Sequence, residues 1–233
     1  MLITGEKEQV FYRHCFVNYH RSMKQILIFG DSNTWGLVPG SHPHKRYAWG
    51  KRWTSILQEK FDPKDVRIAE EGLCGRTTVF EDELRPGRKG VASIPVLLES
   101  HYPVDAMVIM LGTNDCKASY NASSHTIGLG VERCLDEAEK YVKKDSILLI
   151  SPIHLGDEVW KPEKDPEFNA ESVKKSIELK EVYSKIAKRR GFSFIAASDH
   201  VSPSKVDDEH MDEKGHEIFA QVVFDELKSL KLV

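Results

Sequence analysis

The sequence predicts a three-layer α/β/α sandwich around a five-stranded parallel sheet. Five short apolar, β-rich runs recur along the 233 residues, and they lack the in-out alternation of a strand with one solvated face. Segments with apolar residues at three- and four-residue steps lie between these runs, as is typical of helices that pack on a sheet. Because strands and helices alternate, we expect parallel strands that are covered by helices on both faces.

The expected elements follow in chain order. The predicted strands cover residues 25–29, 66–69, 106–111, 146–150 and 192–196. The predicted helices cover residues 53–61, 131–142, 177–187 and about 213–230. Thr34 is placed to open a further short helix directly after the first strand. A chain of this length buries one sizeable core, so we expect a single domain.

The first 22 residues are expected to lie outside that domain. They carry charges throughout and lack the continuous apolar stretch of a signal peptide. Met23-Lys-Gln leads straight into the first predicted strand. We therefore interpret Met23 as the native start and residues 23–233 as the domain, with residues 1–22 as an upstream reading or an appendage that is not native.

Composition argues against several classes of function. The net charge is −3 and there is no basic stripe, which disfavours a nucleic acid partner. No apolar run approaches the ~20 residues that are needed to cross a bilayer, so we expect no membrane association. The four cysteines share no C-x-x-C spacing, so no zinc knuckle or redox pair is encoded locally. We expect reduced thiols in a cytoplasmic protein.

Polar segments follow four of the five predicted strands, and they predict a site. In open α/β sheets, ligands bind outside the carboxyl ends of the strands. The first of these segments, Gly30-Asp-Ser-Asn, delivers Ser32 to a helix start where backbone N–H groups surround its hydroxyl. Taken alone, this segment is equally typical of a strand, a turn and a helix cap.

A serine needs a base, and the base needs an orienting acid, before the hydroxyl can act as a nucleophile at neutral pH. Asp207 and His210, three residues apart after the fifth strand, supply both. Asp208 and Asp212 are alternative acids, and His200 and His216 are alternative bases. His200 has no acid at a comparable spacing, and His216 falls inside the last predicted helix, where a solvated or capping role is expected.

An acyl-transfer site also needs hydrogen-bond donors for an oxyanion. Gly75, after the second strand, can bring its backbone N–H close because it has no side chain. Asn114, after the third strand, offers a side-chain amide. With the N–H of Ser32, three donors come from three separate strand ends, which is hard to explain by helix capping alone.

These blocks, in this order, resemble the motifs of the SGNH (GDSL-type) hydrolases. The matching residues are Gly30-Asp-Ser32, Gly75, Gly112-x-Asn114-Asp115 and Asp207-x-x-His210, and the likeness runs from about Met23 to Leu230. Stretches 30–36, 70–78 and 108–117 look like the bacterial arylesterase and acyltransferase branch. The resemblance implies a flavodoxin-like fold, homo-oligomers, and Ser32 as nucleophile with His210 as base and Asp207 as its orienter. It also implies that Ser32, Gly75 and Asn114 form the oxyanion hole.

Two positions depart from the family pattern. Asn33 stands where many relatives have leucine. Asp208 and Glu209 add acidic charge between the two members of the predicted dyad. This charge is expected to raise the pKa of His210, which affects the pH optimum and leaves the assignment unchanged.

Other residues have competing interpretations. Asp31 and Trp35 are candidate substrate contacts, although Asp31 is better placed to hold the turn, and core packing is an alternative for Trp35. The segment His42-Pro-His44 fits a solvated loop better than a metal site, because metal sites need three or four ligands. Arg76 is expected to form an ion pair with Glu70, Glu71 or Asp82.

Two further features flank the predicted site. Cys74 and Cys116 stand beside the two oxyanion residues, and we interpret both as small packing residues because neither has a predicted base beside it. The segment 151–166, after the fourth strand, is long and contains three prolines. It is a candidate lid, pocket wall or oligomer contact.

The sequence thus predicts a serine esterase that hydrolyses small soluble aryl or short-chain esters through an acyl-enzyme on Ser32, without a metal or organic cofactor. Acyl transfer to alcohols and removal of acetyl groups from carbohydrates use the same site and stay open. A binding module without activity is the alternative of another class, although every expected catalytic position is filled. A nucleotide-binding protein is disfavoured because the first loop has neither G-x-G-x-x-G nor a P-loop.

Overall fold

The computed structural model describes residues 23–231 and has at its centre a five-stranded sheet in the order β2-β1-β3-β4-β5. The strands are β1 Lys24–Gly30, β2 Val66–Gly72, β3 Ala106–Met110, β4 Ile147–Ser151 and β5 Ser193–Ala196. Every neighbouring pair is parallel. All five predicted strands and the parallel sheet are confirmed. The predicted extension of residues 1–22 lies outside the described residues.

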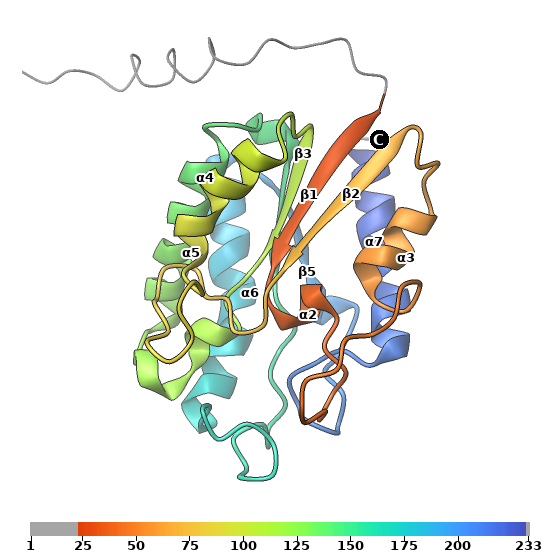
Figure 1. Ribbon diagram of the computed structural model, residues 1–233. Helices are drawn as coiled ribbons and strands as arrows, with labels where there is room; N and C mark the ends of the chain where they lie inside the picture. Colours follow the sequence, from red (N-terminus) through yellow and green to blue (C-terminus); the bar gives the residue numbers. More distant parts are fainter. Residues whose placement is uncertain (1–22, 232–233) are drawn as a thin grey trace, which may run out of the picture.

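Helices cover both faces of the sheet, as predicted (Figure 1). One face carries α4 Gly90–Ser100, α5 Ser124–Ala138 and α6 Ala170–Arg190, and the other carries α3 Trp53–Glu59 and α7 Glu213–Ser229. The short α2 Ser32–Trp35 follows β1, and single turns lie at Asn114–Cys116, Ala118–Tyr120, Lys144–Ser146 and Ala197–Asp199. None of the helices within residues 23–231 combines the length and apolarity needed to cross a membrane.

The core has two halves, one on each side of the sheet. In β1, Leu27 and Phe29 pack under α4, α5 and α6, while Ile26 and Ile28 pack under α3 and α7. All four side chains are fully buried. Because both faces are covered, consecutive strand residues are all apolar, which is the pattern that the sequence shows.

Helices α5 and α6 begin earlier than their apolar patterns because polar caps, which carry no apolar period, set their first turns. At α6, the Asn169 side chain accepts a hydrogen bond from Ser172 N (2.9 Å), and Ser172 Oγ accepts one from Asn169 N (3.1 Å). At α5, Ser123 Oγ accepts a hydrogen bond from Thr126 N (3.1 Å). Gly191, at φ 74°, ends α6 in the left-handed conformation.

Helix α4 is absent from the sequence prediction. It contains Pro95, and its apolar residues lie on several sides, with Ile94 and Leu98 fully buried and Val96 66% exposed. This distribution gives no clear helical period, and an internal proline argues against a helix. The packing of Ile94 and Leu98 against the sheet overrides the weak local signal.

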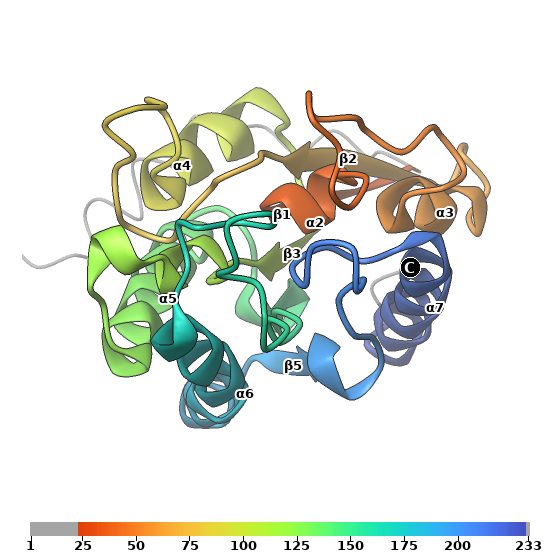
Figure 2. The ribbon, with the colours of Figure 1, turned by 90° about the horizontal axis from the view of Figure 1, so that it is seen from below.

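The carboxyl ends of the strands meet at one edge of the molecule. Figure 2 shows α2 at the centre of this edge, between the segment that follows β4 and the segment that precedes α7. Residues more than 170 positions apart in the chain therefore lie side by side, as the bond between His210 and Ser32 shows.

Candidate active site

Ser32 is the first residue of α2 and follows β1 after a tight turn. The turn needs a glycine at position 30, because a Cβ there would lie 2.0 Å from Thr34 Oγ1 and 2.9 Å from the Met110 carbonyl oxygen. Asp31 caps the helix, its Oδ1 accepting a hydrogen bond from Asn33 N at 3.0 Å. The turn therefore fixes where the Ser32 hydroxyl points.

Ser32, His210 and Asp207 form a continuous hydrogen-bonded chain. His210 Nε2 lies 2.8 Å from Ser32 Oγ, and His210 Nδ1 lies 2.8 Å from Asp207 Oδ2. Asp207 Oδ1 also accepts hydrogen bonds from the backbone N–H groups of Glu209 (3.1 Å) and His210 (3.0 Å), which hold the carboxylate still. All three of the chained residues are more than nine-tenths buried. Such an arrangement can move a proton from a serine hydroxyl to an imidazole.

Asn33 ties the histidine segment to α2. Its Nδ2 donates to the Glu209 carbonyl oxygen (3.2 Å), and its Oδ1 accepts from Met211 N (2.9 Å). These two bonds bracket His210 in the chain and set its distance from Ser32. The sequence identified Asn33 as a departure from the family pattern and gave no sign of this role.

Charge around His210 favours its protonated form. Burial lowers the pKa of His210, but the carboxylates of Glu209 and Asp207 outweigh burial and raise the pKa to about 9. For the carboxyl group of Asp207, burial alone raises the pKa. Its hydrogen bonds and the charge of His210 outweigh burial and bring that pKa below its ordinary value. Asp207 is therefore ionised near neutral pH, as an orienting acid must be.

The three predicted oxyanion donors line one cavity of about 100 Å³. Gly75 sits there at φ 83°, a conformation that favours glycine. Asn114 Nδ2 donates to the Arg76 carbonyl oxygen (3.2 Å), which places the end of β3 beside the Gly75 segment. Asp115 strengthens this contact by accepting a hydrogen bond from Thr78 N at 3.0 Å.

The cavity lining is mostly polar. It consists of Ser32, Leu37, His44, Cys74, Gly75, Arg85, Asn114, Lys117, Asp165, Glu167, Glu209 and His210. A second cavity of about 260 Å³ shares six of these residues and extends along the 163–167 segment. The segment after β4 is thus a pocket wall, one of the three roles that the sequence left open.

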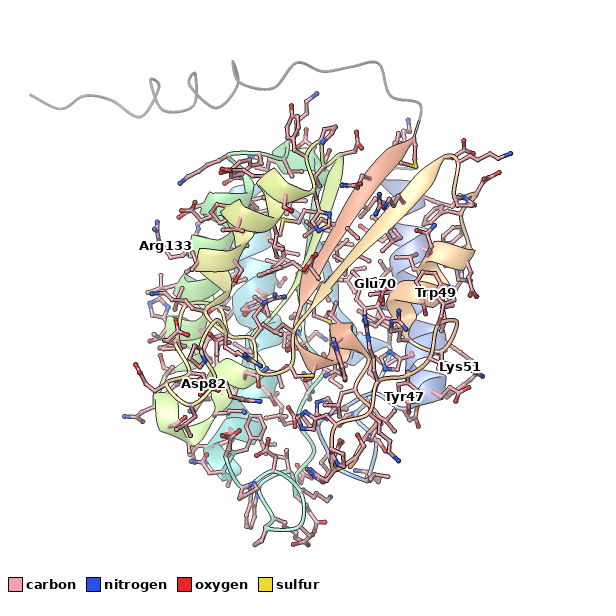
Figure 3. All side chains as sticks on the ribbon, in the orientation of Figure 1. Tyr47, Trp49, Lys51, Glu70, Asp82 and Arg133 are labelled. Atoms are coloured by element: carbon pink, nitrogen blue, oxygen red, sulfur yellow. The ribbon has the colours of Figure 1, made fainter. Side chains whose placement is uncertain are left out.

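Arg85 lies directly over Gly75. A Cβ at Gly75 would come within 2.6 Å of Arg85 Nη2, so the missing side chain makes room for the guanidinium. Asp82 Oδ2 accepts a hydrogen bond from Arg85 Nε (3.0 Å), and Figure 3 labels Asp82 on the segment between β2 and α4. The sequence did not identify Arg85, because its closeness to Gly75 depends on the path of that segment.

Of three further sequence interpretations, that of Arg76 is wrong, that of His216 holds in part and that of Trp35 stays a prediction. Arg76 forms no ion pair within residues 23–231: it donates to the Gly30 carbonyl oxygen (2.8 Å) and covers the Phe29 ring at 4.2 Å. His216 is fully buried, so the predicted solvated role is wrong, while the predicted capping role holds: its Nδ1 accepts a hydrogen bond from the N–H of Trp53 (3.3 Å), the first residue of α3. Trp35 is not among the residues that line these two cavities, and Arg46 lies over its ring at 5.4 Å, so a substrate contact of Trp35 stays a prediction.

The remaining candidates fall outside the cavity or contribute only to its wall. Asp31 caps α2, which is the turn-holding role that the sequence favoured, and a substrate contact of Asp31 stays a prediction. Cys74 lines the smaller cavity, and burial raises the pKa of its thiol to about 11, which makes it a poor nucleophile. Cys116 is fully buried. Within residues 23–231, no group of three or more His, Cys, Asp or Glu side chains could hold a metal ion.

The fold is a parallel α/β/α sandwich, and the segments after its strands carry, in chain order, Ser32, Gly75, Asn114 and the Asp207–His210 pair. This combination defines the class of SGNH hydrolases. Residues 28–218 match the model of the GDSL-like lipase/acylhydrolase family, and the chain belongs to this family. Membership makes the protein an ester hydrolase. No curated protein matches the chain significantly.

Solved structures of esterases share the fold over most of the chain. The Mycobacterium smegmatis aryl esterase is 32% identical with a TM-score of 0.80, over 89% of this chain and 99% of that one. A carbohydrate acetylesterase from Sinorhizobium meliloti is 29% identical with a TM-score of 0.79, over the same shares of the two chains. A putative arylesterase from Agrobacterium tumefaciens is 28% identical with a TM-score of 0.77, over 89% and 100%.

Proposed function

We propose that the protein hydrolyses small soluble carboxylic esters, aryl or short-chain acyl, through an acyl-enzyme on Ser32. The observation that carries the proposal is the unbroken hydrogen-bonded chain from Ser32 through His210 to Asp207, at the mouth of a small polar cavity. The aryl esterase among the similar structures supports the same class of substrate.

The first half of the reaction acylates Ser32. His210 Nε2 takes the proton from Ser32 Oγ as the oxygen attacks the ester carbonyl carbon. Asp207 keeps His210 in the tautomer that leaves Nε2 free to accept this proton. The negative charge on the carbonyl oxygen is held by the N–H groups of Ser32 and Gly75 and by the Asn114 amide. His210 then gives its proton to the leaving alcohol.

The second half releases the acid. Water attacks the acyl carbon while His210 Nε2 accepts one of its protons. The bond to Ser32 Oγ breaks, and Ser32 recovers its proton from His210. The described residues supply each proton acceptor and donor that these steps need, and we propose that neither a metal ion nor an organic cofactor takes part.

The polar lining favours a second candidate substrate, an acetyl group on a carbohydrate. Ten of the twelve residues around the smaller cavity are polar, charged or glycine, the exceptions being Leu37 and Cys74. Such a wall suits the hydroxyl groups of a sugar better than a long acyl chain. One of the similar structures is a carbohydrate acetylesterase.

The test is an ester panel on the wild type and Ser32→Ala. The panel combines p-nitrophenyl esters of increasing acyl length with acetylated sugars. We expect the wild type to prefer acetyl and other short esters, and Ser32→Ala to lose at least ~10³-fold in kcat/KM. Full activity in Ser32→Ala would refute the mechanism. A wild type that hydrolyses none of these esters and resists a fluorophosphonate probe would favour the binding module instead.

A further inference from the structure

Glu209 presents an unused carboxyl group to the reacting atoms. It is 6% exposed and lines both cavities beside Ser32. Its Oε1 lies 3.6 Å from His210 Nε2, the atom that serves Ser32. The backbone of Glu209 bonds to Asp207 and Asn33, but its carboxyl oxygens form no hydrogen bond with any residue of 23–231.

The cations near this carboxyl already have partners. Lys117 pairs with Glu167, and Arg85 pairs with Asp82. Lys164 pairs with Asp208. Asp165 adds a second carboxylate to the same cavity wall. Glu209 therefore faces the cavity as an acceptor whose closest charged neighbour is His210 itself.

Two acceptors 3.6 Å apart can hold one small donor molecule between them. An oxygen atom placed about 2.8 Å from both His210 Nε2 and Glu209 Oε1 satisfies ordinary hydrogen-bond distances to each. Once Ser32 carries an acyl group, its Oγ no longer donates a proton to Nε2, and this position becomes available to the attacking molecule. The position lies in the cavity that the carboxyl of Glu209 lines.

Water and a simple alcohol differ in the number of protons that they can offer. Water has two O–H donors, so it can bond to Nε2 and to Glu209 together. An alcohol with one hydroxyl can bond only to Nε2, and its alkyl group then covers the Glu209 carboxylate. Burying an unpaired charged acceptor is unfavourable, and the resulting discrimination is roughly tenfold to hundredfold.

We propose that Glu209 is a specificity-determining residue that selects water over monohydric alcohols in the second half-reaction. The inference rests on the acyl-enzyme of the proposed function. In this step one water proton passes to His210 Nε2 while the other is held by Glu209. The water oxygen bonds to the acyl carbon, the bond from that carbon to Ser32 Oγ breaks, and His210 returns its proton to Ser32. Glu209 neither gains nor loses a proton.

The direct test measures products with and without the carboxyl. Wild type, Glu209→Met and Asp165→Asn react with p-nitrophenyl acetate in aqueous ethanol at pH 8, and gas chromatography gives the ratio of ethyl acetate to acetic acid. Methionine keeps the side-chain length and removes the acceptor, while Asp165→Asn removes a charge from the same wall at a residue that does not pair with His210 within residues 23–231. We expect the ratio to rise at least ~10-fold in Glu209→Met and to stay within ~2-fold in Asp165→Asn. An unchanged ratio in Glu209→Met, or an equal rise in both variants, overturns the proposal.

A second test uses the wild type alone and does not depend on the folding of a variant. Ethylene glycol carries a neighbouring hydroxyl that can donate to Glu209 while the first hydroxyl bonds to Nε2. At equal concentrations we expect ethylene glycol to accept the acetyl group at least ~5-fold better than ethanol, beyond the factor of two from its second hydroxyl. If ethylene glycol and ethanol accept the acetyl group equally well per hydroxyl group, the proposal is contradicted.

The two proposals fail in different ways. If the reaction does not pass through an acyl-enzyme on Ser32, the Ser32→Ala variant releases p-nitrophenol as fast as the wild type, whatever the products. If only the role of Glu209 is wrong, Ser32→Ala is inactive and the product ratio does not respond to Glu209→Met. If Glu209 has a purely structural role, Glu209→Met slows p-nitrophenol release and leaves the ratio of ethyl acetate to acetic acid unchanged. This result also counts against the proposal.

Discussion

At the scale of single residues, the reactivity of Ser32 is set by how strongly His210 holds a proton. His210 must be neutral to accept the serine proton, yet three carboxylates act on it. Asp207 and Glu209 lie in contact with the ring, and the charge of Asp31 acts from the turn before Ser32. Two other histidines, His44 and His216, have lowered pKa values and so add little positive charge near neutral pH.

This charge balance predicts an alkaline rise in activity. Because the pKa of His210 is raised to about 9, its protonated form persists above neutral pH, and kcat/KM is expected to increase through pH 8 to 9. Glu209→Gln removes one negative charge, which favours the neutral ring and moves the rise down by roughly one pH unit. A pH-stat with ethyl acetate measures this, since alkyl esters resist spontaneous hydrolysis. A rise centred near pH 6.5 in the wild type, or no movement in Glu209→Gln, contradicts the account.

The site residues that the sequence identified are those with a local signature. Ser32 was placed by an apolar run that stops at a glycine, and Asp207 and His210 by a three-residue spacing. Asn33 and Arg85 carry no such signature, because each matters through a residue that only the fold brings beside it. Glu209 was identified as added charge next to His210, but the approach of its carboxyl group to Nε2 depends on side-chain orientation, which the sequence does not reveal. For the same reason the sequence could not place the side chain of Trp35, which turns away to Arg46.

At the scale of structural elements, the site depends on how short segments are tied together. Asn33 joins α2 to the segment that carries Asp207 and His210 through two buried hydrogen bonds. Asn33→Leu is expected to lower the free energy of unfolding by about 2 to 4 kcal/mol and to reduce kcat by a larger factor than KM changes. Urea denaturation and steady-state kinetics on the same preparation measure both.

Asn169→Ala is the matched control for this variant. Asn169 caps α6 and lines neither cavity, so its loss is expected to cost about 1 kcal/mol of stability without a change in kcat. If Asn33→Leu behaves in the same way as Asn169→Ala, the role assigned to Asn33 is incorrect.

The Gly75 segment gives a second prediction at this scale. Gly75→Ala places a methyl group against Arg85 and strains a residue at φ 83°, so we expect kcat/KM to fall by about 10²-fold or more. Gly87→Ala, at φ 88° on the same segment, has the same backbone strain but meets no atom within 4 Å. Both substitutions are expected to cost about 1 to 3 kcal/mol in thermal unfolding. Equal losses of activity in the two variants would show that strain, and not the position of the Gly75 N–H, matters.

The elements themselves were predictable where burial produced a regular pattern. All five strands were found because both faces of the sheet are covered, so most strand residues are apolar, although the edge strand β2 also contains Arg67, Glu70 and Glu71. The starts of α5 and α6 were misplaced because capping residues carry no apolar period, and α4 was missed because Pro95 and its scattered apolar residues obscure its helical pattern. Local caps set the starts of α5 and α6, whereas packing on the sheet decided α4.

At the scale of the whole molecule, the sheet and its two helical layers act as a rigid base for loops that carry the chemistry. A core substitution should therefore change stability and leave the site intact. Leu149→Ala, at a fully buried position in β4, is expected to lower the free energy of unfolding by about 2 to 5 kcal/mol. Leu129→Ala, where the side chain is 49% exposed on α5, is expected to change it by less than about 0.5 kcal/mol. Both should keep wild-type kcat per folded molecule, as urea titration and active-site titration can establish.

The oligomeric state and the choice of ester are also properties of the whole molecule. The homo-oligomer expected from the resemblance stays a prediction, and light scattering of the purified protein addresses it. The family makes the protein an ester hydrolase, and the small cavity around Ser32 supports small esters as the proposed substrates.

The most direct measurement of the central claim is the capture of the acyl-enzyme. The wild type is mixed with p-nitrophenyl acetate, quenched with acid within milliseconds, digested and analysed by mass spectrometry. We predict an acetyl group on the peptide that contains Ser32, together with an initial burst of p-nitrophenol, and neither in Ser32→Ala. An acetyl group that resides instead on Cys74 or on a histidine, or a Ser32→Ala variant that still shows the burst, would contradict the account.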